Sequence, residues 1–372
     1  MPGPQRGAAL LPLRPGPVKP APPAASPSQG RTGIRSSIGS RVAALPPAAF
    51  SIVMATGIVS VAADLMGLTA VAWVLLALNI AAYLVIAALT ILRLARALEH
   101  VRADLRSHDA APGFFTAVAG TCVLGSEILV IAARPDVALG LWILGTLLWS
   151  ILIYTFFTLM TVRREKPRPE EALSGGWMLI VVATQAVSVL GTLLAHTVAP
   201  PGAAILGFTT ALFLIGCMLY VLLFSLIVHR FLFFPFDPEK LTPPYWINMG
   251  AVAITTLAGS LLVIHAPTWA FLREILPFLK GFTLLFWATA TWWIPLLLVL
   301  GAWRHIARRV PLRYDLNYWS MVFPLGMYAV ATLRLAEALG WPPVEPLARA
   351  VGALALAAWS ATAVGLLGRL RG

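Results

Sequence analysis

The longest run without Asp, Glu, Lys or Arg is residues 172–229, ALSGGWMLIVVATQAVSVLGTLLAHTVAPPGAAILGFTTALFLIGCMLYVLLFSLIVH, which is 58 residues long. A helix needs about 20 mostly apolar residues to cross the hydrocarbon core of a bilayer, so this run has room for two crossings. The sequence Ala-Pro-Pro-Gly at 199–202 is typical of a turn near the middle of the run. We therefore predict a hairpin of two membrane-spanning helices here.

Other regions show the same lack of charge. Residues 42–92 contain one charged side chain, Asp64, and residues 241–272 and 281–303 contain none. We divide each charge-poor run into segments of about 20 residues. This division predicts an all-α integral membrane protein with ten transmembrane helices, paired as five hairpins. The predicted spans are near 46–66, 69–92, 114–133, 137–162, 175–197, 203–229, 245–266, 278–302, 315–337 and 347–368.

The composition excludes several classes of protein. Hydrophobic residues make up 59% of the 372 residues and charged residues only 11%, whereas a soluble domain carries about 25% charged residues. An ordinary soluble enzyme is therefore excluded. The net charge of +12 does not indicate a nucleic-acid partner, because the basic residues do not gather into one patch. Cys122 and Cys217 both lie in apolar runs, so no disulfide framework, metal site or cofactor is predicted.

The basic residues are divided unequally between the two ends of the predicted helices. The segment before the first helix, the loops after even-numbered helices and the C-terminus carry 22 of the 27 Lys and Arg residues. Basic residues favour the cytoplasmic side of a membrane, so we predict a multi-pass protein of the cell (plasma or inner) membrane with both termini in the cytoplasm. Residues 1–43, rich in Pro, Gly and Arg, are predicted to be a disordered basic tail, and residues 44–372 the membrane domain.

A weak repeat relates the odd-numbered helices. Each begins near an aromatic residue, at Phe50, Phe115, Trp177, Trp246 and Trp319. Aligned on these residues, the fifth position holds Met54, Ala119, Val181, Gly250 and Phe323. The odd-numbered helices are rich in small residues and the even-numbered ones in bulky residues. This difference predicts an inner ring of odd-numbered helices around a pseudo-five-fold axial pore. Ordinary helix packing through small residues is the alternative.

Three segments carry a resemblance to a known family. They are Phe50-Ser-Ile-Val-Met-Ala-Thr-Gly57-Ile-Val-Ser60, Pro243-Pro-Tyr-Trp-Ile-Asn-Met-Gly250 and Tyr318-Trp-Ser-Met-Val-Phe-Pro324-Leu-Gly326. They resemble helices of the tellurite-resistance/dicarboxylate transporter family, which includes bacterial tellurite-resistance proteins, fungal malate and sulfite carriers and the slow anion channels of guard cells. The resemblance implies five helical hairpins around a pseudo-five-fold axis, assembled as a homotrimer with one pore per subunit. It also implies that Phe323 blocks the pore at mid-membrane.

The residue after Phe323 supports the same role. Pro324 would remove a backbone hydrogen bond inside the helix and bend it. We predict that the bend moves Phe323 into the pore as a gate; ordinary core packing is the alternative. The predicted pore lining is Met54, Gly57, Ala119, Gly120, Val181, Gly250 and Gly326, with close helix contact as the alternative role of the glycines.

Three of the charged residues inside the predicted spans stand out: Asp64, Glu127 and Arg334. Charges in a membrane are costly and are usually paired or functional. Arg334 lies three helical turns beyond Phe323, close in height to Asp64 at the outer mouth. We favour an ion pair between them, with a free arginine that captures anions as the alternative. For Glu127, a proton carrier in coupled transport and a hydrogen bond to a Thr or Ser on a neighbouring helix are equally compatible with the sequence.

Together these features predict transport of small anions through the axial pore. The candidates are C4-dicarboxylates such as malate and oxyanions such as sulfite and tellurite, attracted by a basic cytoplasmic rim. Passive and proton-coupled transport both stay open. The predicted partners are the anionic substrate and the lipid bilayer. The alternative is a membrane-embedded enzyme such as a lipid-modifying transferase, but the sequence shows no cluster of carboxylates or nucleophile–base pair, so no catalytic residue is assigned.

Overall fold

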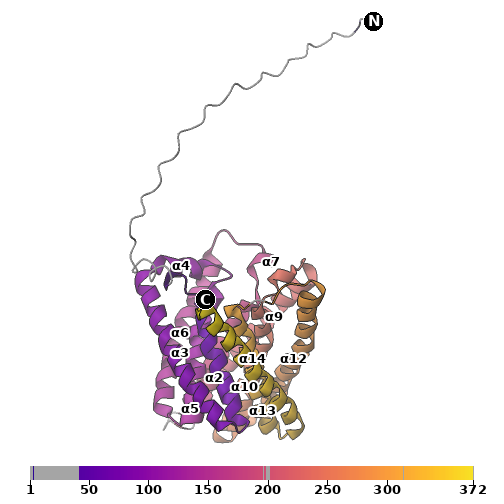
Figure 1. Cartoon of the computed structure of the whole chain (residues 1–372). Helices are drawn as coiled ribbons and strands as arrows, with labels where there is room; N and C mark the ends of the chain where they lie inside the picture. The colour runs from indigo at the N-terminus through magenta and orange to yellow at the C-terminus, as the bar shows by residue number, and fades with distance from the viewer. Residues whose placement is uncertain (1–2, 4–41, 196, 198–201, 313, 372) are drawn as a thin grey trace.

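The structure, a computed structural model, describes residues 3, 42–195, 197, 202–312 and 314–371. All regular secondary structure in these residues is helical, and ten helices are long and apolar enough to cross a membrane. The prediction of an all-α membrane protein with ten spans is confirmed. Figure 1 shows these helices packed side by side as one bundle. The predicted tail, residues 1–43, lies almost wholly outside the described residues.

The odd-numbered spans form a closed inner ring. Each of these five helices contacts its two neighbours, and the last contacts the first. Between 67% and 94% of the residues in their apolar windows are buried. The ring consists of α2 (Ser51–Leu65), α5 (Phe115–Ala132), α8 (Leu179–Leu194), α10 (Ile247–His265) and α13 (Trp319–Leu339).

The even-numbered spans pack around this ring. Each outer helix contacts the inner helix before it in the chain and the next inner helix around the ring. Only 17–44% of the residues in their apolar windows are buried, and Leu84 and Ile151 are 61% and 63% exposed. Such a surface suits contact with lipid, which explains the bulky apolar residues of these helices. The outer helices are α3 (Thr69–Arg96), α6 (Pro135–Val162), α9 (Gly202–Phe233), α12 (Leu276–Ala302) and α14 (Glu345–Arg371).

Hydrogen bonds between tryptophan and threonine side chains tie the outer helices to the ring. Three outer helices donate from an indole Nε1 to the hydroxyl of an inner helix, at 2.9–3.0 Å. The pairs are Trp149–Thr184, Trp287–Thr332 and Trp359–Thr56. Polar side chains inside a membrane bond across helices because lipid offers them no partner. These bonds fix the rotation of α6, α12 and α14 against the ring.

Every inner helix begins with a 3-10 turn. The turns are η1 (Pro47–Phe50), η2 (Ala111–Phe114), η3 (Gly175–Met178), η5 (Pro243–Trp246) and η8 (Leu316–Tyr318). Three of them have a proline at the first or second position. Proline suits these positions because its fixed φ matches the helix and its missing N–H has no helical partner there. The five hairpins therefore share the same local start.

The two ends of the bundle differ. One end, here called the charged end, carries α4 (Leu98–Arg106), α7 (Pro169–Ala172) and the last turns of α14 (Figure 1). At the opposite end, here called the turn end, short connections join α2 to α3, α5 to α6 and α13 to α14. Gly67 and Gly340 take the left-handed conformation in two of these turns, with φ of 86° and 63°. Glycine adopts this conformation without a steric penalty.

Gly175 and Gly176 offer a matched test of how closely the inner helices approach one another. A Cβ atom at Gly175 would lie 2.4 Å from the carbonyl oxygen of Pro244, a backbone atom of the neighbouring turn η5. At Gly176 the nearest atom is Ser174 Oγ, at 3.3 Å. We expect Gly175→Ala to lower the free energy of unfolding by about 1–3 kcal/mol and Gly176→Ala to leave it nearly unchanged. Equal stability of the two purified variants in thermal unfolding would contradict this contact.

Candidate functional site

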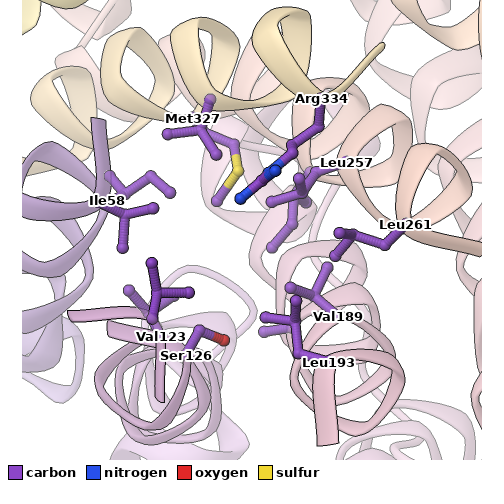
Figure 2. A pocket seen from close by; sticks show the side chains of 14 residues that line it. Ile58, Val123, Ser126, Val189, Leu193, Leu257, Leu261, Met327 and Arg334 are labelled. Carbon is purple, nitrogen blue, oxygen red and sulfur yellow. The ribbon is translucent and has the colours of Figure 1, made fainter. Parts of the chain in front are cut away.

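The ring encloses a cavity on its axis near the turn end, here called the turn-end cavity. Its volume is about 40 Å³, and all five inner helices line it. Its wall is apolar except for Ser126 and Arg334 (Figure 2). The lining residues are Ile58 and Val61 of α2; Val123, Ser126 and Val130 of α5; Ala186, Val189 and Leu193 of α8; Ile254, Leu257 and Leu261 of α10; and Met327, Val330 and Arg334 of α13.

A second cavity lies at the charged end, here called the charged-end cavity. Its volume is about 500 Å³. The 3-10 turns that begin the five inner helices all contribute to its wall, so it lies on the same axis as the turn-end cavity. The residues from these turns include Pro47, Gly113, Gly176, Tyr245 and Asn317.

The charges around the charged-end cavity are mixed. The charged residues that line it are Asp109, Glu170, Glu171, Arg230 and Lys240. Arg230 is 7% exposed, and its guanidinium donates hydrogen bonds to the carbonyl oxygen of Leu173 and the hydroxyl of Tyr245. The expected basic rim therefore does not hold for the wall of this cavity. The loops place acidic residues at the mouth of the ring. The basic rim was predicted from the basic residues alone, so these acidic residues were not expected.

The two cavities are separated by two turns of packed helix. On α10 the charged-end cavity reaches Ile247 and the turn-end cavity starts at Ile254. On α13 the corresponding residues are Ser320 and Met327. Seven residues of helix rise about 10 Å. The axis therefore has a hollow at each end and a packed section about 10 Å thick between them.

One layer of this packed section lies a single helical turn from the turn-end cavity. Residues four apart share a face of a helix, so the layer holds the residues four positions before the first lining residue of each helix. These residues are Met54, Ala119, Val182, Gly250 and Phe323. Met54 and Phe323 are 1% exposed, and Ala119 and Val182 are fully buried. Phe323 is the largest side chain of the layer.

The layer differs from the sequence repeat at one helix. The repeat placed Val181 at this level, whereas the periodicity of α8 places Val182 there and turns Val181 away from the axis. The aromatic residues occupy different positions relative to the 3-10 turns. Phe50 and Trp246 end their turns, Phe115 and Trp319 follow theirs, and Trp177 is the third of four residues in η3. Alignment on Trp177 places α8 one position away from its axial periodicity.

The predicted pore-lining glycines lie at contacts between helices and line neither axial cavity. A Cβ at Gly326 would be 3.1 Å from Val59 Cγ2 of α2, and one at Gly120 would be 3.4 Å from the backbone oxygen of Phe50. A Cβ at Gly250 would be 2.8 Å from Cγ of Pro324. The absence of a side chain at Gly250 thus makes room for the ring of Pro324, the residue next to Phe323.

Arg334 and Asp64 do not form the predicted ion pair. Nη1 of Arg334 donates to Oε2 of Glu337, one turn further along α13, at 2.6 Å. Asp64 has neither an ion pair nor a side-chain hydrogen bond among the described residues. The sequence placed the two residues at similar heights but did not fix which way each side chain points around its helix. Glu337 was missed, although its spacing of three residues from Arg334 is typical of a helical pair.

Glu127 of α5 lies against Asn79 of the outer helix α3 and close to Gly57 of α2. It is fully buried, and its Oε2 accepts a hydrogen bond of 2.7 Å from Nδ2 of Asn79. Its Oε1 and the Oδ1 of Asn79 have no hydrogen-bond partner among the described residues. Gly57 makes room for the pair, because a Cβ there would lie 2.8 Å from Nδ2 of Asn79. Of the two roles predicted for Glu127, a hydrogen bond to a neighbouring helix is present, but the partner is Asn79 and not the predicted Thr or Ser.

The arrangement defines a class of protein: a helical membrane protein with hollows at both ends of one ring axis. Residues 44–367 match the voltage-dependent anion channel family, so the chain belongs to that family and the predicted family resemblance is confirmed. An uncharacterized membrane protein of Mycobacterium tuberculosis (strain ATCC 25618 / H37Rv) is 46% identical over 153 residues, which cover 41% of this chain and 77% of that protein. An uncharacterized transporter of Methanocaldococcus jannaschii is 24% identical over 311 residues, 80% of this chain and 86% of that protein.

The Glu127–Asn79 pair yields a stability test. No described cation pairs with Glu127, and an unpaired charge is costly inside a membrane. We therefore expect that a neutral side chain which accepts the hydrogen bond from Asn79 is enough to keep the fold stable. Glu127→Gln should keep the free energy of unfolding nearly unchanged. Glu127→Ala should lower it by about 1–3 kcal/mol, because the buried amide of Asn79 loses its acceptor. Thermal unfolding of the purified variants measures both. Equal losses in the two variants would show that the charge itself is required.

Proposed function

We propose that this protein carries small anions across a membrane along the axis of its inner helix ring. The single observation that carries the proposal is the pair of cavities on that axis, separated by a packed section that contains Phe323. Membership of an anion channel family supports transport of anions in general. The candidate substrates are C4-dicarboxylates such as malate and oxyanions such as sulfite and tellurite. The family and the names of the relatives favour a transporter or channel over a membrane-embedded enzyme.

Phe323 is proposed as the gate. Its equivalents on the other four inner helices are smaller or unbranched, so one aromatic ring is enough to fill the layer. Pro324 supports the role, because a proline inside a helix leaves one backbone carbonyl without its N–H partner and makes the helix easier to bend at that point. The ring of Phe323 can leave the axis if α13 bends there.

Replacement of Phe323 tests the gate. Phe323→Ala should raise anion flux into proteoliposomes several-fold, because it removes a steric barrier without removing a charge. Phe213, a fully buried residue of the outer helix α9, is the matched control. Phe213→Ala should cost about 3–5 kcal/mol of stability, as buried phenylalanines do, and should not raise flux. Flux would be measured with malate, sulfite, nitrate and chloride.

An unstable Phe323→Ala protein with unchanged flux would show that Phe323 is core packing. Raised flux of cations together with anions would also contradict the gate, since the variant should keep its preference for anions.

The proposed orientation places the charged end of the bundle in the cytoplasm of the cell, at the plasma or inner membrane. The basic residues of the loops and termini support this orientation. The exposed apolar surface of the outer helices is proposed to face lipid and, in part, two further copies of the chain in a homotrimer. The family resemblance supports the trimer.

Cysteine labelling tests the orientation. Cys122 and Cys217 are buried, so the natural cysteines give a low background. Glu99→Cys lies on α4 at the charged end, where the side chain of Glu99 is 83% exposed. Thr69→Cys lies at the start of α3 at the turn end. In intact cells an impermeant maleimide should label Thr69→Cys and spare Glu99→Cys. The reverse pattern would contradict cytoplasmic termini.

Proton-coupled transport is a second candidate mechanism. Glu127 favours it, because this carboxyl is fully buried in a membrane span and its Oε1 has no hydrogen-bond partner in the part of the chain that the structure describes. A negative charge is costly inside a membrane, so a carboxyl in such a place favours its neutral, protonated form and can carry a proton. Coupling predicts that Glu127→Gln loses uptake driven by a pH gradient but keeps exchange of anions across the membrane. In a passive channel, Glu127→Gln would change neither the uptake nor the exchange of anions.

A further inference from the structure

Arg334 lies between two hollows at the turn end. It lines the turn-end cavity on the axis and also a pocket of about 420 Å³ at the rim of the ring, which contains Glu337 and Glu345. Figure 2 shows the guanidinium of Arg334 pointing into the turn-end cavity, near Met327 and Leu257. One of its nitrogens, Nη1, is bound to Glu337 at 2.6 Å. Arg334 is therefore held at the rim but directed toward the axis.

The rest of the turn-end cavity offers little to an anion. Twelve of the fourteen lining residues are apolar, and the hydroxyl of Ser126 already donates to the carbonyl oxygen of Cys122 at 3.0 Å. An anion in this cavity would therefore depend on the guanidinium of Arg334. The volume of about 40 Å³ is enough for a small anion, because about 10–15 Å³ on this measure is enough for a water molecule.

The ion pair between Arg334 and Glu337 is weak enough for an anion to compete with it. The side chains of Arg334 and Glu337 are 27% and 51% exposed, and exposed ion pairs are worth only about 0–1 kcal/mol. A guanidinium has five N–H donors in a planar fork. Glu337 occupies one of them, which leaves the others for a second acceptor.

We propose that the turn-end cavity binds a small anion on the guanidinium of Arg334, and that the carboxylate of Glu337 is a built-in competitor for the same guanidinium. The proposal rests on the proposed anion transport and assigns to that path a binding site at the turn end. An anion in the cavity binds N–H donors of Arg334 that Glu337 leaves free, and the nearby negative charge of Glu337 weakens this binding. Glu337 thereby keeps the affinity low enough for release, which conduction requires.

Anion binding to the purified full-length protein tests the proposal without any transport step. The unfolding midpoint is measured as chloride replaces gluconate at constant ionic strength, and again with nitrate, because a ligand of the folded state raises the midpoint with concentration. Glu337→Gln should tighten the apparent Kd for both anions about two- to fivefold, the range that release of an exposed ion pair allows. Arg334→Gln should weaken it at least tenfold, and Arg334→Lys should restore part of the loss.

Asp136→Asn is the matched control for the change in charge. Asp136 pairs with Arg134 at 2.7 Å, at the turn end but on the outer helix α6 and outside the lining of the cavity. Its apparent Kd values should equal those of the unmodified protein. A Glu337→Gln variant that binds no more tightly than Asp136→Asn would overturn the competitor role, and so would tighter binding in Asp136→Asn.

The outcomes separate this proposal from the proposed function. Unchanged binding in Arg334→Gln, or no effect of chloride or nitrate on the unmodified protein, would overturn the site even if proteoliposomes show anion flux. Binding that follows the expected order without flux of any anion would overturn the transport function and keep the site. If Arg334→Gln fails to fold, the ratio of Kd values between Arg334→Lys and the unmodified protein decides the case, and a ratio of one overturns the site.

Discussion

The close contact of neighbouring inner helices is the constraint on which the rest of the structure depends. At Gly326, Gly250 and Gly175 the adjoining helix or turn comes so near that a Cβ atom would meet it at 3.0 Å or less. Five helices packed this closely enclose a narrow axis, and a narrow axis is one that a single aromatic ring can fill. Larger residues at these contacts would push the helices apart and widen the layer of Phe323. The glycines thus act on the axis from a distance, through the spacing of the helices.

The sequence was sufficient for the parts of the fold that the bilayer dictates. Lipid excludes charge over the thickness of its hydrocarbon core, so charge-free runs such as 172–229 mark the spans directly. The division into inner and outer helices also followed from residue size, because lipid-facing helices tolerate bulk and ring helices do not. Four of the five residues in the layer of Phe323 followed from a repeat of aromatic residues. The fifth did not follow, because the residue four positions after Trp177 is Val181, whereas the periodicity of α8 places Val182 on the axis.

The polar partners could not be read from the sequence in the same way. Two acids, Glu337 and Asp64, lie at about the same height along the axis as Arg334. Only the directions of the side chains determine that Arg334 pairs with Glu337. Asn79 lies 48 residues from Glu127, and their hydrogen bond depends on how α3 packs against α5. The acids at the charged-end cavity come from loops whose course no periodicity describes. Each of these features depends on the rotation of one element against another, which hydrophobic patterns leave undetermined.

The common start of the inner helices has an electrostatic consequence. All five begin at the charged-end cavity, and the turns η1, η2, η3 and η5 begin without a side-chain cap. The peptide dipoles of a helix add up to roughly half a positive elementary charge at its N-terminus. Five such ends surround one mouth, and together they oppose the field of the carboxylates Asp109, Glu170 and Glu171. The backbone thereby supplies a fixed positive potential that no substitution of a side chain can remove.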